Sequence, residues 1–351
     1  MRDLCLLKAK EENFLEIVHI KAFGHQLTWV DLASSSSSSS LTTIHRLAVY
    51  YLGNLEFLQT LDLRRWSISS LRIPNVLWRS KQLRHLYLPS RIKLAGTNKL
   101  RLDSLNKLET LEYFDTEYCD VRCLSKLTNL QKFSGEVAPK DLAVMLKSPI
   151  LNNSNCLLQY SSFWISGDFE TKEQSLLRQL LGCHHLRQLS LWGYLNLVDK
   201  LPDKFPPNLT YLHMGNTELE EDPMPTLEKL PNLRSLILDW NSYIGKEMVC
   251  SSAPTTPSNS SRCFPQLKSL MLESIQNLEE WKVEQGAMSC LFRLVIIVDC
   301  PKLKEIPNGL RFITTLRELQ IQRVSEALRD RHREGGEDFY KVHHVPSIII
   351  P

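Results

Sequence analysis

Residues 230–238 read LPNLRSLIL, and their apolar positions decide the fold. Leu233, Leu236 and Leu238 follow the spacing apolar-x-x-apolar-x-apolar. Because the last two positions are two residues apart, their side chains lie on the same side of a short strand, and the residues between and beside them point to the other side. A single strand of this kind buries almost nothing, so the stretch needs neighbouring copies of itself to form a core.

The same spacing recurs along most of the chain. The copies before residue 150 are Ile44/Leu47/Val49, Leu58/Leu61/Leu63, Leu83/Leu86/Leu88, Leu108/Leu111/Tyr113 and, more weakly, Leu130/Phe133/Gly135. The other later copies are Leu186/Leu189/Leu191, Leu209/Leu212/Met214, Leu267/Leu270/Leu272, Phe292/Val295/Ile297 and Leu316/Leu319/Ile321. One further copy is expected at 157–163, where the register is ambiguous. The average separation is about 26 residues, within the period of leucine-rich repeats.

This period predicts an α/β fold, a leucine-rich-repeat solenoid. We expect a curved horseshoe with a parallel β-sheet on the concave face and an irregular or short-helical convex side. Leu-Pro or Ile-Pro pairs at 73–74, 201–202 and 306–307 fit irregular return segments, where a proline need not join a hydrogen-bonded ladder. Amphipathic helices are the alternative, but glycine and proline interrupt helical spacing in nearly every copy.

The repeats account for residues 44–325, about 12 units, and the rest of the chain divides into short segments. A polar Pro/Ser stretch predicts a loop insertion at 250–262. Residues 34–43 contain seven consecutive serines and are expected to be a linker. Residues 1–33 are too few to bury a core of their own. Residues 326–351 return to apolar side chains after a charged run, and we expect them to cap the open edge of the last repeat.

Composition narrows the function classes. Apolar residues make up 43% of the chain and charged residues 23%, as in soluble globular proteins. The net charge of +3 is too weak to indicate a nucleic-acid partner. No stretch has the ~18 apolar residues of a membrane span, and no export signal is visible. We therefore expect a cytoplasmic protein whose nine cysteines are reduced thiols.

Motifs spread over most of the chain carry a resemblance to one family. They are MRDLC at 1–5, KAKEENF at 8–14, LRHLYLP at 83–89, LTNLQKFSGE at 127–136, LPNLRSLIL at 230–238, LEEW at 278–281, CPKLKEIPNGL at 300–310 and EGGEDFYKV at 334–342. Together they resemble the leucine-rich-repeat region of plant intracellular immune receptors, the nucleotide-binding leucine-rich-repeat disease resistance proteins of the coiled-coil type. The resemblance implies that residues 1–33 are a remnant of the winged-helix segment that closes the nucleotide-binding module.

The chain departs from that family where nucleotide would bind. Arg2 follows Met1 in place of the histidine of the family's Met-His-Asp motif. The only Gly-Lys pair, Gly245-Lys246, is followed by Glu247 and lacks the earlier glycine of a phosphate-binding loop. We therefore expect a truncated receptor without the nucleotide-binding domain and without a cofactor, and the family's nucleotide switch is not carried over.

No catalytic or metal site is predicted. Cys183-His184-His185 and His343-His344 are the strongest candidates, but adjacent histidines on an extended segment point to opposite sides and suit one ion poorly. Cys119 and Cys123 have no second pair at zinc spacing. We interpret these residues as core thiols and turn histidines.

The repeat itself identifies the side chains that face outward on the concave side. These predicted partner-binding residues are Tyr87, Phe114, Trp192, Tyr211, His213, Asp239 and Gln320, with Trp240 just beyond its strand. Trp192 and Tyr211 belong to neighbouring repeats and could form one patch, and tryptophan and tyrosine dominate binding hot spots. The alternative is that exposed aromatic residues are ordinary surface. A basic group at the N-terminal end comprises Arg64, Arg65, Arg84 and His85, and the resemblance implies a contact with a nucleotide-binding module there.

These observations predict a non-enzymatic protein-recognition module in plant innate immunity. Its partner would be a pathogen effector, a guarded host protein or a nucleotide-binding module. A substrate adaptor for ubiquitin ligation is the alternative, but it would need an F-box-like segment for which residues 1–33 are too short. An extracellular receptor would show an export signal and a uniform L-x-G-x-I-P repeat. An inactive receptor fragment remains a further alternative.

Overall fold

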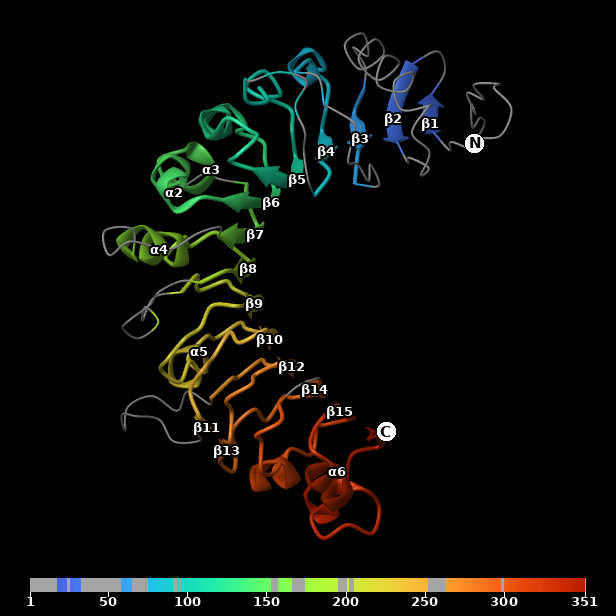
Figure 1. Ribbon diagram of the computed structural model, residues 1–351, viewed down its shortest axis with the longest axis vertical. Coiled ribbons are helices and arrows are strands. Elements are labelled where there is room, and N and C mark those ends of the chain that lie inside the picture. The colour runs from blue at the N-terminus through green and yellow to red at the C-terminus, as the bar shows by residue number, and fades with distance from the viewer. Residues whose placement is uncertain are drawn as a thin grey trace. The chain divides into compact units, whose positions relative to one another are not determined.

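The computed structural model describes most of the chain (Figure 1). The described residues are 18–23, 26–32, 58–64, 73, 75–90, 94, 96, 98–152, 157–165, 174–194, 201, 205–251, 263–297 and 300–350. The predicted copy at Ile44, the serine linker at 34–43, most of the predicted loop at 250–262 and the side chain of Arg65 lie outside them. The chain forms two compact units, residues 1–164 and 165–351, which we call unit one and unit two.

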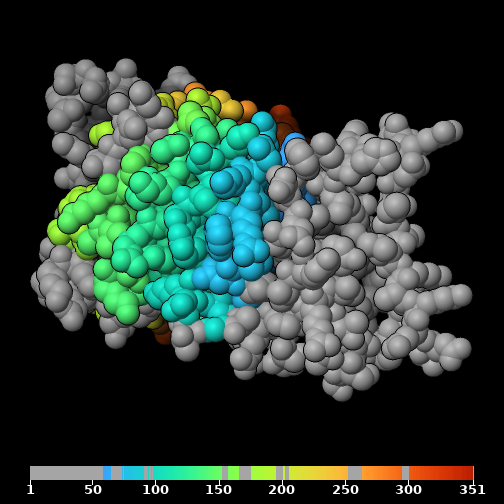
Figure 2. Space-filling model, turned by 90° about the horizontal axis from the view of Figure 1, so that it is seen from above, coloured from blue at the N-terminus to red at the C-terminus, as the bar shows by residue number. Residues whose placement is uncertain are grey.

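Unit one contains a sheet in which strands follow one another in chain order. The strands are β1 (Val18–Phe23), β2 (Gln26–Leu32), β3 (Thr60–Asp62), β4 (His85–Tyr87), β5 (Thr110–Asp115), β6 (Lys132–Val137) and β7 (Tyr160–Ile165). The return segments contain the 3₁₀ helices η1 (Leu77–Arg79) and η2 (Val121–Lys126) and the helices α2 (Pro139–Leu146) and α3 (Pro149–Asn152). β1 and β2 are antiparallel, and the pairs from β2 to β6 are parallel. In the space-filling view its repeats succeed one another in closely packed bands from blue to green (Figure 2).

Part of the N-terminal segment joins this sheet. β2 lies within residues 1–33 and pairs in parallel with β3, with Val30 opposite Leu61. Residues 26–32 are therefore the sheet neighbour of β3, and the predicted copy at Ile44 stays untested.

Unit two repeats the same arrangement of strands and return segments, and its return segments add a separate two-stranded sheet. Its main strands are β8 (Gln188–Trp192), β9 (Tyr211–Gly215), β10 (Ser235–Asp239), β12 (Ser269–Glu273), β14 (Arg293–Ile297), β15 (Glu318–Gln322) and β16 (Ser347–Ile349), all parallel to their neighbours. The return segments contain α4 (Gln174–Leu181), α5 (Met224–Leu227), η4 (Asn308–Phe312), α6 (Glu326–His332), η5 (Phe339–Lys341) and the parallel pair β11 (Glu247–Cys250) and β13 (Glu280–Val283). Within the unit, Figure 1 shows the main strands along one side and the return segments along the other.

The repeating leucines form the core of both units, which confirms the predicted leucine-rich-repeat fold. Leu212, Leu236, Leu270, Leu294 and Leu319 are opposite one another on successive strands of unit two. All five side chains are buried. Burying these rows between sheet and return segments removes apolar surface that no single repeat could hide.

Asparagines in the return segments tie neighbouring repeats together. The Asn232 side chain of LPNLRSLIL donates to the Pro207 carbonyl at 2.8 Å. Asn129, at the same position of LTNLQKFSGE, donates to the Asn106 carbonyl at 2.7 Å. These bonds satisfy backbone carbonyls that the short strands leave outside the ladder.

The predicted copy Leu108/Leu111/Tyr113 is wrong at its last position. A one-residue bulge in β5 shifts the register between Leu111 and Phe114, and Tyr113 has a positive φ of 58°. Such a bulge reverses which side chains face the core. Phe114 is therefore fully buried, and Tyr113 is 45% exposed. Phe114 packs on Phe133 with ring centroids 5.6 Å apart, so the prediction that Phe114 faces a partner is also wrong.

The predicted copy Phe292/Val295/Ile297 is wrong by one residue. Leu294, not Val295, lies opposite Leu270 and Leu319 on the adjacent strands. Leu291 and Leu294 are buried, whereas Phe292 is 47% exposed. The segment is apolar in both registers, so its own sequence could not decide, and pairing with the neighbouring leucines selects one.

The uncertain copy at 157–163 has a defined register. Leu158 and Phe163 are buried at the first and last positions, and Ser161 occupies the middle one. A polar residue at a core position explains why the pattern was ambiguous. Phe163 continues the aromatic stack, with its centroid 5.6 Å from that of Phe133.

The C-terminal segment continues the sheet by one strand. β16 pairs with the edge of β15, with Ile348 opposite Leu319. Lys341 is almost fully buried and donates to the Glu305 carboxylate at 3.0 Å and the Ile306 carbonyl at 3.2 Å. These bonds anchor the segment on the preceding return segment, while the capping role of residues 326–351 stays a proposal.

Candidate protein-binding surface

Each parallel strand presents alternate side chains away from the leucine core, and we call this side of the sheet in each unit its open face. On the open face of unit two, successive strands align their side chains in rows. Ser190 is opposite His213, and Gln188 is opposite Tyr211. The predicted partner-binding residues of this unit therefore lie on strands whose order the sheet fixes.

Trp192, Tyr211 and His213 form what we call the open-face cluster. The Trp192 and His213 rings meet edge to face with centroids 4.8 Å apart. The Tyr211 and His213 rings are also perpendicular, with centroids 6.5 Å apart. All three side chains are half-buried, and burial raises the pKa of the Tyr211 hydroxyl. His213 thus joins the two aromatic residues that the sequence predicted to be one patch, and neither of them points into the core.

Gly215 gives Trp192 its position. The two residues are directly opposite on β8 and β9. A Cβ atom at Gly215 would lie 2.6 Å from Cε3 of Trp192, well inside van der Waals contact. The indole therefore crosses β9 where only glycine leaves room for it. Sequence reasoning missed this residue, although a glycine at an outward strand position was a visible signal.

Asp239 follows Gly215 in the same row and is mostly buried. It is 7% exposed, and its Oδ2 lies 3.5 Å from Nε2 of His213. Neither Oδ1 of Asp239 nor Nε2 of His213 has a hydrogen-bond partner. The next residue, Trp240, is 62% exposed and has a positive φ of 44°. The turn after β10 thus places an indole in solvent beside a carboxylate whose hydrogen-bonding capacity is not filled.

Glu273 is a further acidic side chain here that sequence reasoning missed. It ends β12, the strand next to β10, and its backbone carbonyl accepts a bond from the Trp240 N–H at 3.1 Å. Burial raises the pKa of the Glu273 carboxyl, and the nearby Asp239 raises it further. A glutamate at an outward position looks like ordinary solvated surface, so nothing in the sequence marked it.

Gln320 is not brought into the cluster. It lies half-buried on β15 in the row of His213, Ile237 and Met271, but separated from β9 by three strands. At ~4.8 Å per strand, it lies about 19 Å from His213 along the sheet.

The predicted basic group of unit one is largely neutralised by acidic neighbours. Arg64 donates to Asp62 at 3.0 Å and lies 4.4 Å above the Tyr87 ring. It is also 3.7 Å from Glu112, which pairs with Lys132 at 2.7 Å. We call Asp62, Arg64, Tyr87, Glu112 and Lys132 the paired network.

The rest of the predicted basic group is likewise engaged. Arg84 pairs with Glu109 at 3.1 Å, and Nδ1 of His85 lies 3.1 Å from the Thr110 hydroxyl. The contact proposed for this end of the chain is untested, but it would have to displace existing partners.

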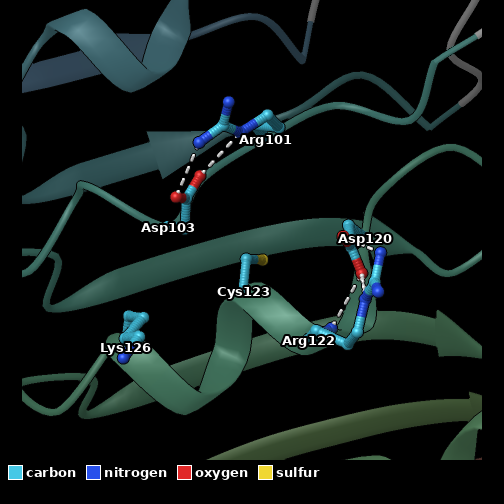
Figure 3. Close-up of a pocket in the computed structure, with 6 residues that line it drawn as sticks. All are labelled: Arg101, Asp103, Asp120, Arg122, Cys123 and Lys126. Carbon is cyan, nitrogen blue, oxygen red and sulfur yellow. Dashed lines mark hydrogen bonds and ion pairs between the residues drawn. The ribbon is translucent and has the colours of Figure 1, made fainter.

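The return side of unit one has a cavity of about 280 Å³ lined by charged residues (Figure 3). Arg101 is paired with Asp103 and Arg122 with Asp120, both through two nitrogens. These bonds lower the pKa of both carboxyls. Burial raises the pKa of the Cys123 thiol, which makes it a poor nucleophile. Both arginines that line the cavity are therefore engaged by carboxylates, whereas Lys126 lines it without an ion pair to a described residue.

The described residues contain no group of three or more metal-ligating side chains. None of the seven described cysteines is in a disulfide, and six of them are buried. None of the helices in the described part of the chain has the length and apolar character needed to cross a lipid bilayer.

Comparisons with known proteins agree with this architecture. The family described as "Leucine-rich repeat region" matches residues 35–340. "Disease resistance protein RPP8" of Arabidopsis thaliana is 32% identical over 99% of this chain and 45% of its own length. "Probable disease resistance RPP8-like protein 4" of Arabidopsis thaliana is 31% identical over the same shares. The chain thus spans less than half the length of these relatives.

A solved structure titled "Crystal structure of TLR13-ssRNA13 complex" is also similar. It covers 85% of this chain and 50% of its own, with 18% sequence identity and a TM-score of 0.40.

Proposed function

The chain belongs to the leucine-rich-repeat family, and on that premise we propose that it is the non-catalytic protein-recognition module of a plant disease resistance protein. In this proposal its partner is a pathogen effector, a host protein that an effector modifies, or the nucleotide-binding module of a receptor. The module acts in the cytoplasm, in the innate immune response.

The open-face cluster is the observation that carries the proposal. Trp192, Tyr211 and His213 present half-buried rings on neighbouring strands, and Trp240 adds an exposed indole. Tryptophan and tyrosine bury large areas at a small cost in conformational entropy, which is why they recur at binding hot spots. The three rings lie on strands of the sheet, and the absence of a side chain at Gly215 leaves room for the Trp192 indole. Binding therefore costs little side-chain conformational entropy.

The paired network of unit one supports the same choice of surface. Its charged groups already satisfy one another, so a partner would gain little there without breaking an ion pair. We therefore assign recognition to the open face of unit two.

Binding measurements with defined partners test this proposal. The full chain is titrated with a panel of pathogen effectors and with the nucleotide-binding module of a receptor of the resembled family. Trp192→Ala and Tyr211→Ala should each weaken binding by about 2 kcal/mol, roughly thirtyfold in Kd. The matched control is Tyr340→Ala, because Tyr340 is an exposed aromatic residue in η5 on the return side.

The proposal fails if every partner that binds does so equally well with the open-face variants. It also fails if Tyr340→Ala causes the larger loss, because recognition would then belong to the return side.

A further inference from the structure

The open face of unit two has carboxylates without a cationic partner, which distinguishes it from a solvated charged surface. Among the described residues, Asp239 makes no ion pair except the 3.5 Å approach to His213, which is charged only if protonated. No described lysine or arginine forms an ion pair with Glu273 either. The positive charge of Arg323 acts on Glu273 only through space, without an ion-pair contact.

The position of Asp239 makes this arrangement unusual. An almost fully buried carboxylate is normally paired or fully hydrogen-bonded, because burying charge is costly. Here Oδ1 has no partner, although the side chain belongs to the outward row of Trp192 and Gly215. A group placed at this cost, on the face proposed to bind a protein, points to a ligand that completes its interactions.

The surrounding side chains specify the chemistry of that ligand. Two carboxylates on adjacent strands attract a cation and repel phosphate, which excludes a nucleic-acid backbone. The exposed Trp240 ring next to Asp239 offers a π face, on which guanidinium groups stack. A planar guanidinium can stack on an indole and donate to carboxylates through separate nitrogens.

Resting on the proposed function, we propose that the open-face cluster with Asp239 and Glu273 receives an arginine or lysine side chain of the bound protein. Asp239 and Glu273 accept hydrogen bonds from the cationic head, and Trp240 contacts its flat face or its aliphatic stem.

A peptide library tests the inference on the full chain. Random 12-residue peptides are selected on the wild-type chain, and we expect arginine and lysine to be enriched in the binders. One binder is then resynthesised with citrulline, the neutral isostere, at the enriched arginine. We expect about tenfold weaker binding of the citrulline peptide, the size typical of one charge-assisted hydrogen-bonded contact.

Variants locate the contact. Asp239→Asn and Glu273→Gln should each reproduce that loss and remove most of the difference between the two peptides, as in a double-mutant cycle. Glu220→Gln is the control, because Glu220 is an exposed acid outside the strands. Circular dichroism of both variants checks that the fold is intact, and the more exposed Glu273 keeps the test valid should Asp239→Asn unfold.

The outcomes separate this inference from the proposed function. Binders that are lost on Trp192→Ala but show no basic enrichment, or no effect of citrulline, overturn the inference and leave the proposed function standing. Binders that are indifferent to Trp192→Ala and to both acidic variants contradict both. A library that yields no binder also counts against the inference.

Discussion

The two units share one scaffold but use their open faces differently. In unit one, Arg64, Glu112 and Lys132 satisfy one another across three strands, and Arg64 covers the Tyr87 ring. In unit two, Asp239 has an unpartnered oxygen and the Trp240 ring beside it is 62% exposed. Both units bury the same rows of core leucines, so the outward positions alone distinguish the two faces.

The largest expected loss of stability follows from changes in the leucine core that the two units share. Leu111→Ala in unit one and Leu236→Ala in unit two should each lower the free energy of unfolding by about 3 kcal/mol, because both fully buried side chains would leave cavities. Urea denaturation measures this, and Gln131→Ala at an exposed position should change it by less than about 0.5 kcal/mol. A cost below about 1 kcal/mol for either leucine would show that its unit lacks this core.

That shared core is the part most completely predictable from sequence. The spacing of Leu233, Leu236 and Leu238 determines which side of a strand is buried, and it repeats often enough to fix the fold. The exceptions occur where both registers are apolar. Tyr113-Phe114 and Leu291-Phe292 each offer two large side chains for one core position, and only a bulge or the neighbouring strand selects between them.

The second-largest effect is expected at Gly215, the glycine that leaves room for the Trp192 ring. Gly215→Ala should lower the free energy of unfolding by about 1 kcal/mol and shift the tryptophan fluorescence, because the new methyl group would displace the indole. Gly96→Ala in unit one is the matched control, since a Cβ there meets nothing within 4 Å. Equal behaviour of the two variants would show that Trp192 does not depend on the space over Gly215.

The third effect compares the acidic residues of the two faces. Glu112→Gln should lower the free energy of unfolding by about 1 kcal/mol, a modest value because Arg64 and Lys132 are about half exposed. Asp239→Asn should cause no loss, because the charge it removes has no cationic partner. Thermal unfolding at neutral pH measures both variants. A clear loss for Asp239→Asn would mean that its carboxylate is already satisfied within the chain.

The smallest effect is a pH dependence at Glu273. Burial and the charge of Asp239 raise the pKa of this carboxyl in the fold, while His213 and Arg323 lower it by less. Its ionised form is therefore slightly unfavourable in the fold, a cost that is present above the folded pKa and disappears as the pH falls below the unfolded value.

Glu273→Gln should thus be slightly more stable than the wild type at pH 7 and equal to it near pH 3. Unfolding midpoints of the two proteins, compared at each pH, measure this difference. A gain that persists at pH 3 would assign the effect to packing.

The candidate site was predictable only in part, for physical reasons. The repeat places Trp192, Tyr211 and His213 on one face, because strand parity follows from the leucines. The burial of Asp239 and its position near Glu273 depend on the turn after β10. This turn has positive φ values at Trp240 and Asn241, which no sequence pattern reveals. The pairing of Arg64 with Asp62 and Glu112 depends on side-chain positions that spacing does not encode.

One binding ratio tests the contrast between the two faces most directly. For any effector or nucleotide-binding module that binds the full chain, Kd is measured for Trp192→Ala in unit two and for Tyr87→Ala in unit one. We predict a weakening of roughly thirtyfold for Trp192→Ala and of less than about twofold for Tyr87→Ala. The reverse order, with Tyr87→Ala abolishing binding and Trp192→Ala leaving it intact, would contradict the assignment of recognition to unit two.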